Sequence, residues 1–211
     1  MLASLVSCSG EAPEIRQVFW QLNVTQDPSI DLEFEELSVF VNVADADGVE
    51  DVDLLYILQD RHELLWELTS GGWQRFENGE EVWVGSNSIQ MADGLPFPRD
   101  LYRVILIDRS GERSRDEFYI NSDEIDGKRA NFPRSTVRDG TIIVEGEFTE
   151  VTFWFYDSEH SLVKIFTSGE RELPLASALN TRELQTASYF HANTVDSAGG
   201  YGLIFGPVYL E

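Results

Sequence analysis

The stretch that decides the fold is residues 36–60, ELSVFVNVADADGVEDVDLLYILQD. In residues 37–43 apolar side chains alternate with Ser38 and Asn42, a period of two that indicates a strand with one buried face. After the turn at residues 45–48, DADG, residues 52–58 have apolar side chains at both odd and even positions, which predicts a central strand covered on both faces. We therefore expect two strands joined by an acidic turn.

Composition limits the classes of protein and partner that this chain can represent. Its 211 residues allow one large domain or two small ones, and a hydrophobic share of 42% is typical of a folded chain. With 38 Asp and Glu against 15 Lys and Arg, the formal net charge is −23, which argues against nucleic acid as a partner because phosphates would be repelled. No apolar run is long enough to predict a transmembrane helix.

Short strands separated by turn residues continue outward from this stretch. They are predicted at residues 15–24, 37–43, 52–59, 64–69, 73–77, 80–85, 101–108 and 116–120. Asn78-Gly79 is a hairpin turn pair, and a two-residue loop there would pair Glu77 with Glu80 and Phe76 with Glu81. So many short strands within about a hundred residues predict a two-sheet sandwich.

One segment of this region resembles a known family. Residues 95–111, LPFPRDLYRVILIDRSG, are similar to the sixth strand of fibronectin type III and bacterial immunoglobulin-like domains. The resemblance covers residues 13–120. It implies that Tyr102 is a corner tyrosine, with a buried ring and a hydroxyl bonded back to the preceding loop. The chain has a single cysteine, so an antibody-type disulfide framework is excluded.

The C-terminal part repeats the same pattern after a polar segment. Residues 121–135, which include Pro133, are predicted to be a linker. Strands are then expected at residues 141–144, 151–156, 162–166, 189–194 and 201–210, and residues 175–187 fit a short helix or a loop. The predicted fold class is all-β, an immunoglobulin- or fibronectin III-like sandwich followed by a second, smaller β domain at residues 136–211. The alternative is a C-terminal lobe that completes the first sheet.

The N-terminal residues 1–12 carry the one cysteine. Leu5-Val6-Ser7-Cys8 resembles the lipobox of bacterial lipoproteins, and a short polar tether follows it. The resemblance implies a signal peptide, lipid attachment at Cys8, and a location at the bacterial cell envelope, periplasmic or on the outer surface. The alternative is an ordinary free cysteine.

Catalytic motifs are incomplete throughout the chain. His62-Glu63 begins like a zinc-protease helix, but Trp66 stands where the second histidine ligand belongs. Ser161 and Lys164 have the spacing of penicillin-binding enzymes but fall in a predicted strand. His160 and His191 are isolated in the sequence. The sequence therefore predicts a protein that is not an enzyme and holds no organic cofactor.

Calcium is the one ion that the sequence suggests. The acidic turn places Asp45, Asp47, Asp51 and Asp53 around Gly48, and carboxylates so spaced can wrap Ca²⁺. The alternative is an ordinary turn, in which Asp side chains accept hydrogen bonds from nearby backbone N–H groups.

The predicted surface for a partner is the apolar set left over once one sheet face fills the core. Its members are Leu55, Ile57, Phe76, Trp83, Ile105 and Ile107. A patch of this size needs cover. It can be covered by an envelope protein or a second copy of the chain, or by the second lobe through Trp154 and its neighbours.

Two functions remain open at this stage. The first is a membrane-tethered, non-enzymatic binding or assembly module of the cell envelope that acts through an apolar sheet face. The second is a carbohydrate-binding or carbohydrate-processing lipoprotein that uses exposed aromatic rings and carboxylates. A flat aliphatic face favours the first function, and exposed aromatic rings beside a groove favour the second.

Overall fold

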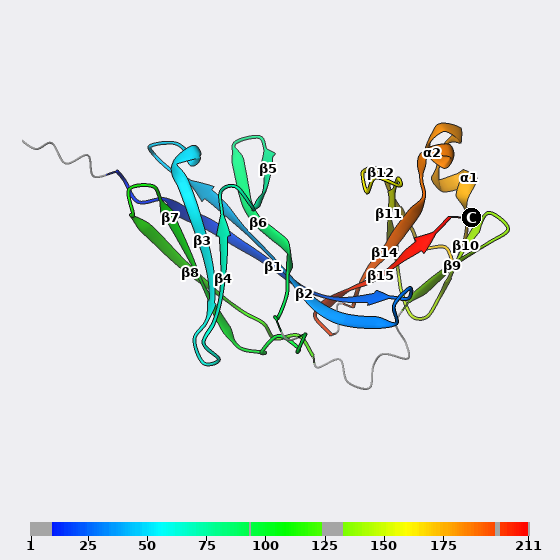
Figure 1. The fold of residues 1–211 in the computed structure, drawn as a ribbon, viewed down its shortest axis with the longest axis horizontal. Coiled ribbons are helices and arrows are strands. Elements are labelled where there is room, and N and C mark those ends of the chain that lie inside the picture. The colour runs from blue at the N-terminus through cyan, green and yellow to red at the C-terminus, as the bar shows by residue number, and fades with distance from the viewer. Residues whose placement is uncertain (1–9, 93, 124–132, 197–198, 211) are drawn as a thin grey trace, which may run out of the picture. The chain divides into compact units, whose positions relative to one another are not determined.

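The computed structural model describes residues 10–92, 94–123, 133–196 and 199–210, and strands make up most of them (Figure 1). The all-β, sandwich-like architecture predicted from the sequence is confirmed. The chain divides into two compact units: unit 1 comprises Met1–Gln21, Leu37–Ile89 and Pro98–Asn121, and unit 2 comprises Leu22–Glu36, Gln90–Phe97 and Ser122–Glu211. Strands β1 (Glu14–Asp27) and β2 (Leu32–Ala44) contribute residues to both units.

Unit 1 is a sandwich of two sheets. Its remaining strands are β3 (Val52–Gln59), β4 (Leu64–Thr69), β5 (Gln74–Asn78), β6 (Glu81–Ile89), β7 (Leu101–Asp108) and β8 (Arg113–Tyr119), with a single 3-10 turn, η1 (Val49–Asp51), before β3. In one sheet β1, β2, β6 and β5 are neighbours in that order, and in the other the order is β4-β3-β7-β8. The second order is that of strands C′, C, F and G in immunoglobulin-like sandwiches.

The core of unit 1 follows from the alternation along its strands. In β2 the side chains of Leu37, Val39, Val41 and Val43 are at most 2% exposed, as the period of two predicted. Ser38 and Asn42 on the other face are also buried, so the prediction of a single buried face is wrong. From the facing sheet, Tyr102 stacks on Phe118 with ring centroids 5.3 Å apart, and Trp20 of β1 stacks on the same Phe118 at 5.7 Å. Aromatic rings therefore join the two sheets.

The position of Tyr102 agrees with what the resemblance implied. Its side chain is completely buried, and its hydroxyl donates a hydrogen bond of 3.0 Å to the carbonyl of Pro98 in the preceding loop. This bond ties the start of β7 to the loop that leads into it.

Replacing Tyr102 with Phe is expected to lower the free energy of unfolding by about 1–3 kcal/mol, because the partly buried Pro98 carbonyl loses its donor while the ring stays in place. The measurement is the urea midpoint at unchanged m-value. Tyr119→Phe is the matched control: this tyrosine is 52% exposed, so we expect a change within about 0.5 kcal/mol. Equal midpoints for both variants would contradict a structural role for the Tyr102 hydroxyl.

The hairpin between β5 and β6 differs from the predicted register by one residue in its turn. Asn78 pairs with Glu81 and Phe76 pairs with Trp83, so the loop is Gly79-Glu80 rather than Asn78-Gly79. Gly79 takes a positive φ of 63° at the first loop position, where a type II′ turn requires glycine, and Asn78 therefore stays in the strand. Phe76 and Trp83 still share one face, as predicted.

Unit 2 contains one further sheet, of three strands, together with four more strands of the sheet that contains β1 and β2, and two short helices. Its elements are β9 (Arg134–Arg138), β10 (Thr141–Glu145), β11 (Val151–Tyr156), β12 (Leu162–Ser168), β13 (Glu172–Pro174), α1 (Leu175–Ala178), α2 (Thr181–Thr186), β14 (Tyr189–Asp196) and β15 (Tyr201–Tyr209). Strand order is β13-β10-β9 in the three-stranded sheet and β12-β11-β14-β15-β1-β2-β6-β5 in the eight-stranded sheet.

Strand β1 continues past the boundary predicted for the first strand. Beyond Val24 it runs on to Asp27, and residues Asn23 to Gln26 pair in parallel with β15. For this reason Leu22–Glu36 belongs to unit 2, although the sequence prediction placed these residues in the N-terminal domain.

The core of unit 2 is aromatic. Phe153, Phe155 and Phe190 are completely buried, and the ring of Phe190 lies 5.6 Å from each of the other two. Residues 175–187, for which a helix or a loop was predicted, form α1 and α2, and Asn180 caps α2 through a capping box with Glu183. Within the described residues, no helix has the length and apolar character needed to cross a bilayer.

Candidate functional site

The six residues predicted to form one partner surface lie in three different places in unit 1: two are in the core, two are on the outer face of one sheet, and two are on the outer face of the other. Leu55 and Ile57 are completely buried, since Leu55 pairs with Leu106 and Ile57 with Val104 on the core side of the β3–β7 pair. That part of the prediction is wrong, because the register of this pair sets which parity faces inward and local sequence does not show it.

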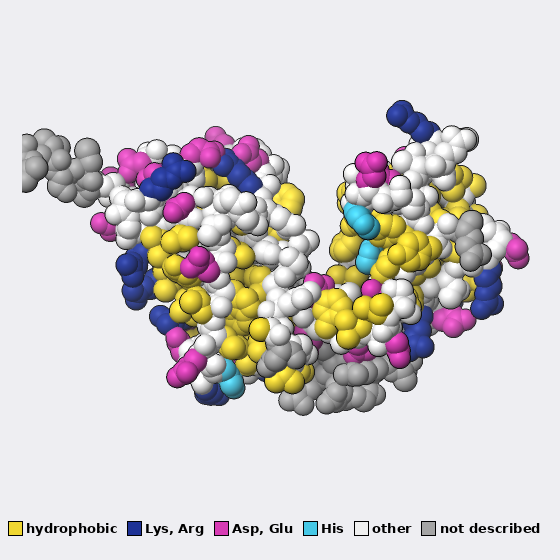
Figure 2. All heavy atoms as spheres, viewed as in Figure 1, with side chains coloured by type: hydrophobic (Ala, Val, Ile, Leu, Met, Phe, Trp, Pro, Cys, Tyr) yellow, Lys and Arg dark blue, Asp and Glu magenta, His cyan; other side chains and the backbone are white. Residues whose placement is uncertain are grey.

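Ile105 and Ile107 lie on the opposite side of the same sheet. There they share an outer face with other apolar side chains, which we call the aliphatic face: Leu54, Tyr56, Leu58, Leu65, Ile105 and Ile107. Leu65 is 57% exposed and the others are partly exposed. Figure 2 shows hydrophobic side chains gathered over β3, β4 and β7 in this part of the molecule.

Arginines line the β8 side of the aliphatic face. In the β7–β8 register Arg115 lies opposite Ile105, and Arg113 lies opposite Ile107. Both arginines are exposed. A third arginine, Arg103, makes two hydrogen bonds of 2.7 and 2.6 Å to the carboxylate of Asp60, which lowers the pKa of that carboxyl.

Phe76 and Trp83 belong to the other sheet. With Phe19 of β1 and Phe40 of β2 they line an open groove of about 260 Å³, which we call the aromatic groove. The rings of Phe40 and Phe76 are 5.5 Å apart and inclined at 60°, and Phe19 and Phe76 remain 47% and 56% exposed. The sequence prediction found two of these four residues. The other two lie on strands distant in sequence, so only the sheet order reveals them.

Trp83 is held in orientation by a neighbour on its own strand. Its indole N–H donates a hydrogen bond of 3.1 Å to the carboxylate of Glu81, two residues away on the same face. Glycine shapes the floor of the aromatic groove: Gly85 pairs with Phe40, and a Cβ on Gly85 would lie 2.9 Å from the Phe40 ring and closer still to the backbone of β2. A side chain at position 85 would therefore displace Phe40.

Carboxylates dominate the surroundings of the aromatic groove. The hairpin that carries Phe76 and Trp83 also carries Glu77, Glu80 and Glu81. Its one basic residue, Arg75, is bonded to both Glu50 and Glu77. The groove therefore lies in a strongly negative part of unit 1.

The four aspartates of the acidic turn do not all point to one place. Asp45 accepts a hydrogen bond of 2.8 Å from the backbone N–H of Asp47, and Asp53 accepts one of 3.1 Å from the Ser70 hydroxyl. The first is the bond of an Asx turn, whereas the second joins two segments that are 17 residues apart in sequence. Across the described ranges, no cluster of three or more His, Cys, Asp or Glu is placed to hold a metal ion. Calcium binding at Asp45, Asp47, Asp51 and Asp53 stays a prediction, which melting curves with and without millimolar Ca²⁺ test.

Unit 2 carries an aromatic cluster that the sequence prediction missed. Tyr156 and Tyr189 stack at 5.3 Å with an interplanar angle of 15°, and His191 lies edge-on to both. His160 Nδ1 lies 2.7 Å from the Tyr189 hydroxyl, and Tyr209, 61% exposed, adjoins Tyr189. His160 and His191 are thus brought together around Tyr189. The sequence held one indication of this cluster. Tyr189 and His191 are two residues apart on a predicted strand, so their side chains share a face.

Burial sets the ionisation of this cluster. It lowers the pKa of His191 and raises the pKa of Tyr156. Burial also raises the pKa of Tyr189, and the neighbouring Tyr156 and Tyr209 add to that shift. Burial therefore favours the neutral forms of His191, Tyr156 and Tyr189.

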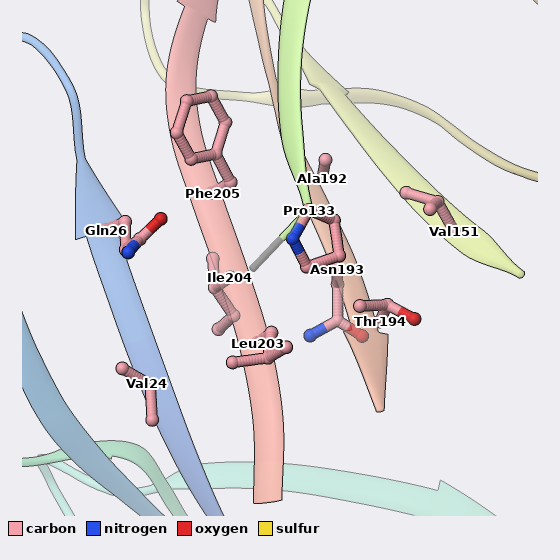
Figure 3. Close-up of a pocket in the computed structure, with 10 residues that line it drawn as sticks. All are labelled: Val24, Gln26, Pro133, Val151, Ala192, Asn193, Thr194, Leu203, Ile204 and Phe205. Carbon is pink, nitrogen blue, oxygen red and sulfur yellow. The ribbon is translucent and has the colours of Figure 1, made fainter. Parts of the chain in front are cut away.

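A small cavity lies among β1, β14 and β15 near Pro133 (Figure 3). Its volume is about 10 Å³, which is about the room that one water molecule needs. Figure 3 shows mainly aliphatic and amide side chains around it, including Val24, Leu203 and Asn193. The cavity is a packing gap rather than a ligand site.

Cys8, the predicted lipid-attachment residue, lies outside the described residues. No protein-family model matches the chain, and a search of curated proteins gives no match either.

Proposed function

We propose that this protein is a membrane-tethered, non-enzymatic binding or assembly module of the bacterial cell envelope, which holds its partner through the apolar outer faces of unit 1. The observation that carries the proposal is the aromatic groove, where large rings line a concave surface and two of them are about half exposed. Concave aromatic sites surrounded by polar residues are where binding energy concentrates in protein interfaces.

The two exposed rings of this groove supply part of the energy that specific binding needs. Covering about 100 Å² each of Phe19 and Phe76 would contribute about 5 kcal/mol at about 25 cal/mol per Å². Because association itself costs several kcal/mol, these two rings alone would not suffice, and further contacts must come from Phe40, Trp83 and the surrounding polar groups.

The tether and the location rest on the residues around Cys8. Lipidation there would hold unit 1 and unit 2 at a membrane surface through the acyl chains alone. Recovery of the native protein in the detergent phase, with a blocked N-terminus, supports this part of the proposal. Recovery as a water-soluble protein with a free thiol at Cys8 overturns it.

The test of the binding function is a substitution on the groove. Phe76→Ser should lower the capture of an envelope protein by the immobilised chain at least about tenfold, because it removes an anchor ring. Leu162→Ser is the matched control, since Leu162 is 52% exposed but lies on β12 in unit 2. Equal capture by wild type and Phe76→Ser would count against the groove as the binding site.

Carbohydrate binding is the second candidate, and the aromatic cluster of unit 2 favours it. Stacked Tyr156 and Tyr189, with exposed Tyr209 beside them, offer ring faces on which the apolar side of a sugar can lie, and His160 adds a hydrogen-bonding group. A glycan array tests this function. Binding of a glycan by wild type that Tyr209→Ala abolishes would support it, and an array without binding would reject it.

A further inference from the structure

The two apolar outer faces of unit 1 differ in the charges that lie beside their apolar side chains. The aromatic groove is on the sheet that contains β1, β2, β6 and β5, and its hairpin carries three glutamates. The aliphatic face is on the sheet β4-β3-β7-β8, and arginines line its β8 side. The aliphatic face also carries Glu67 opposite Tyr56 and Glu117 opposite Arg103, so arginines prevail only beside Ile105 and Ile107.

The charges on the aliphatic face are available to a partner. Arg113 and Arg115 are exposed and take part in none of the ion pairs found within the described residues, whereas Arg103 is already bonded to Asp60. On the groove side, Glu80 and Glu81 form no ion pair in the same part of the structure, although Glu81 accepts the indole hydrogen bond of Trp83. The two arginines, Arg113 and Arg115, therefore match the two glutamates, Glu80 and Glu81, in number and are opposite to them in sign.

Resting on the proposed function, we propose that the partner is a second copy of this chain, whose aliphatic face docks on the aromatic groove of its neighbour. Ile105 and Ile107 of one copy would cover Phe76 and Trp83 of the next. Arg113 and Arg115 would then face Glu80 and Glu81. The sequence grouped these apolar residues as one patch, and in this contact they form the two sides of one interface.

Charge disfavours one symmetric alternative. Pairing two aromatic grooves would bring Glu80 and Glu81 of both copies together, and like charges across an interface cost several kcal/mol. Pairing two aliphatic faces would allow Glu67 of one copy to face Arg115 of the other, and E80K/E81K would then leave assembly unchanged. The favoured contact joins two different faces, so only the two copies at the ends of an open chain keep one groove or face unused. Such head-to-tail contacts build rings or open chains rather than two-fold dimers.

The experiment is a reciprocal charge reversal, read by light scattering over a range of concentrations at low salt. The variants E80K/E81K and R113E/R115E should each weaken self-association more than about tenfold, because each makes its own two faces alike in charge. Mixed in equal amounts, they should assemble again within about threefold of the wild-type affinity, since each supplies the face that the other needs. E145K/E147K changes charge equally on exposed residues of unit 2 and should leave assembly unchanged.

The same variants distinguish a lost interface from a misfolded protein. Loss of assembly supports the inference only if the variant keeps the wild-type melting curve. Restored assembly in the mixture shows by itself that both variants are folded. An apolar variant, I105S/I107S, should also lose assembly, and adding salt should weaken assembly of the wild type.

Two outcomes overturn the inference. One is a wild-type chain that stays monomeric at the highest soluble concentration, and the other is a mixture of charge-reversed variants that does not assemble. If the wild type is monomeric but Phe76→Ser abolishes capture of an envelope protein, self-docking is wrong and the proposed function stands. If neither capture nor self-association depends on Phe76, both proposals fail.

Discussion

Replacing Gly85 with Ala is expected to lower the free energy of unfolding by more than about 3 kcal/mol, a size seen only when a substitution forces backbone to move. A Cβ at position 85 would lie 2.0 Å from the carbonyl oxygen of Val39 and 2.7 Å from the Cα of Phe40. Neither atom belongs to a flexible side-chain end. The pairing of β2 with β6, which places the rings of the aromatic groove, must therefore shift or break.

Gly71→Ala is the matched control for this prediction. A Cβ at Gly71 has no heavy atom within 4 Å, so we expect a change within about 0.5 kcal/mol. Urea unfolding followed by circular dichroism measures both variants. If Gly85→Ala unfolds at the wild-type midpoint, the close approach of β6 to β2 at this position is wrong, and so is the account of the groove floor.

The sequence predicted the strands well where the decisive pattern is local. The observed bounds of β3, β4, β7 and β11 coincide with the predicted residues 52–59, 64–69, 101–108 and 151–156. Each of these strands shows its apolar pattern and its turn residues within a short window, so neighbouring residues alone specify it. The same is true of Tyr102, whose buried ring and bonded hydroxyl follow from its place at the start of β7.

Contacts between distant strands were not predictable in the same way. Ile57 was grouped with Ile105 because both are apolar, yet antiparallel register puts Ile57 opposite Val104 and turns Ile105 outward. A shift of one residue exchanges the faces of a strand, and nothing within either strand fixes that shift. The aromatic groove could not be predicted for the same reason. Phe19 and Phe76 line one groove only because their strands, β1 and β5, are parts of the neighbouring set β1-β2-β6-β5.

Phe190→Ala is expected to lower the stability of unit 2 by about 3–5 kcal/mol, because it empties space between two other buried rings. Phe190 is completely buried and its ring lies 5.6 Å from both Phe153 and Phe155. Val195→Ala on the same strand is the control: Val195 is 59% exposed, so its change should stay within about 0.5 kcal/mol.

This variant also tests whether the two units unfold separately. Of the five tryptophans, Trp154 alone belongs to unit 2, so tryptophan emission mainly reports unit 1 while circular dichroism reports both. The buried cluster around Phe190 contains residues of unit 2 only, so we expect dichroism to be lost first and the emission change to keep its wild-type midpoint. If both signals instead shift together to lower denaturant, the units unfold as one, because β1 and β2 contribute residues to each and pass the loss in unit 2 on to unit 1.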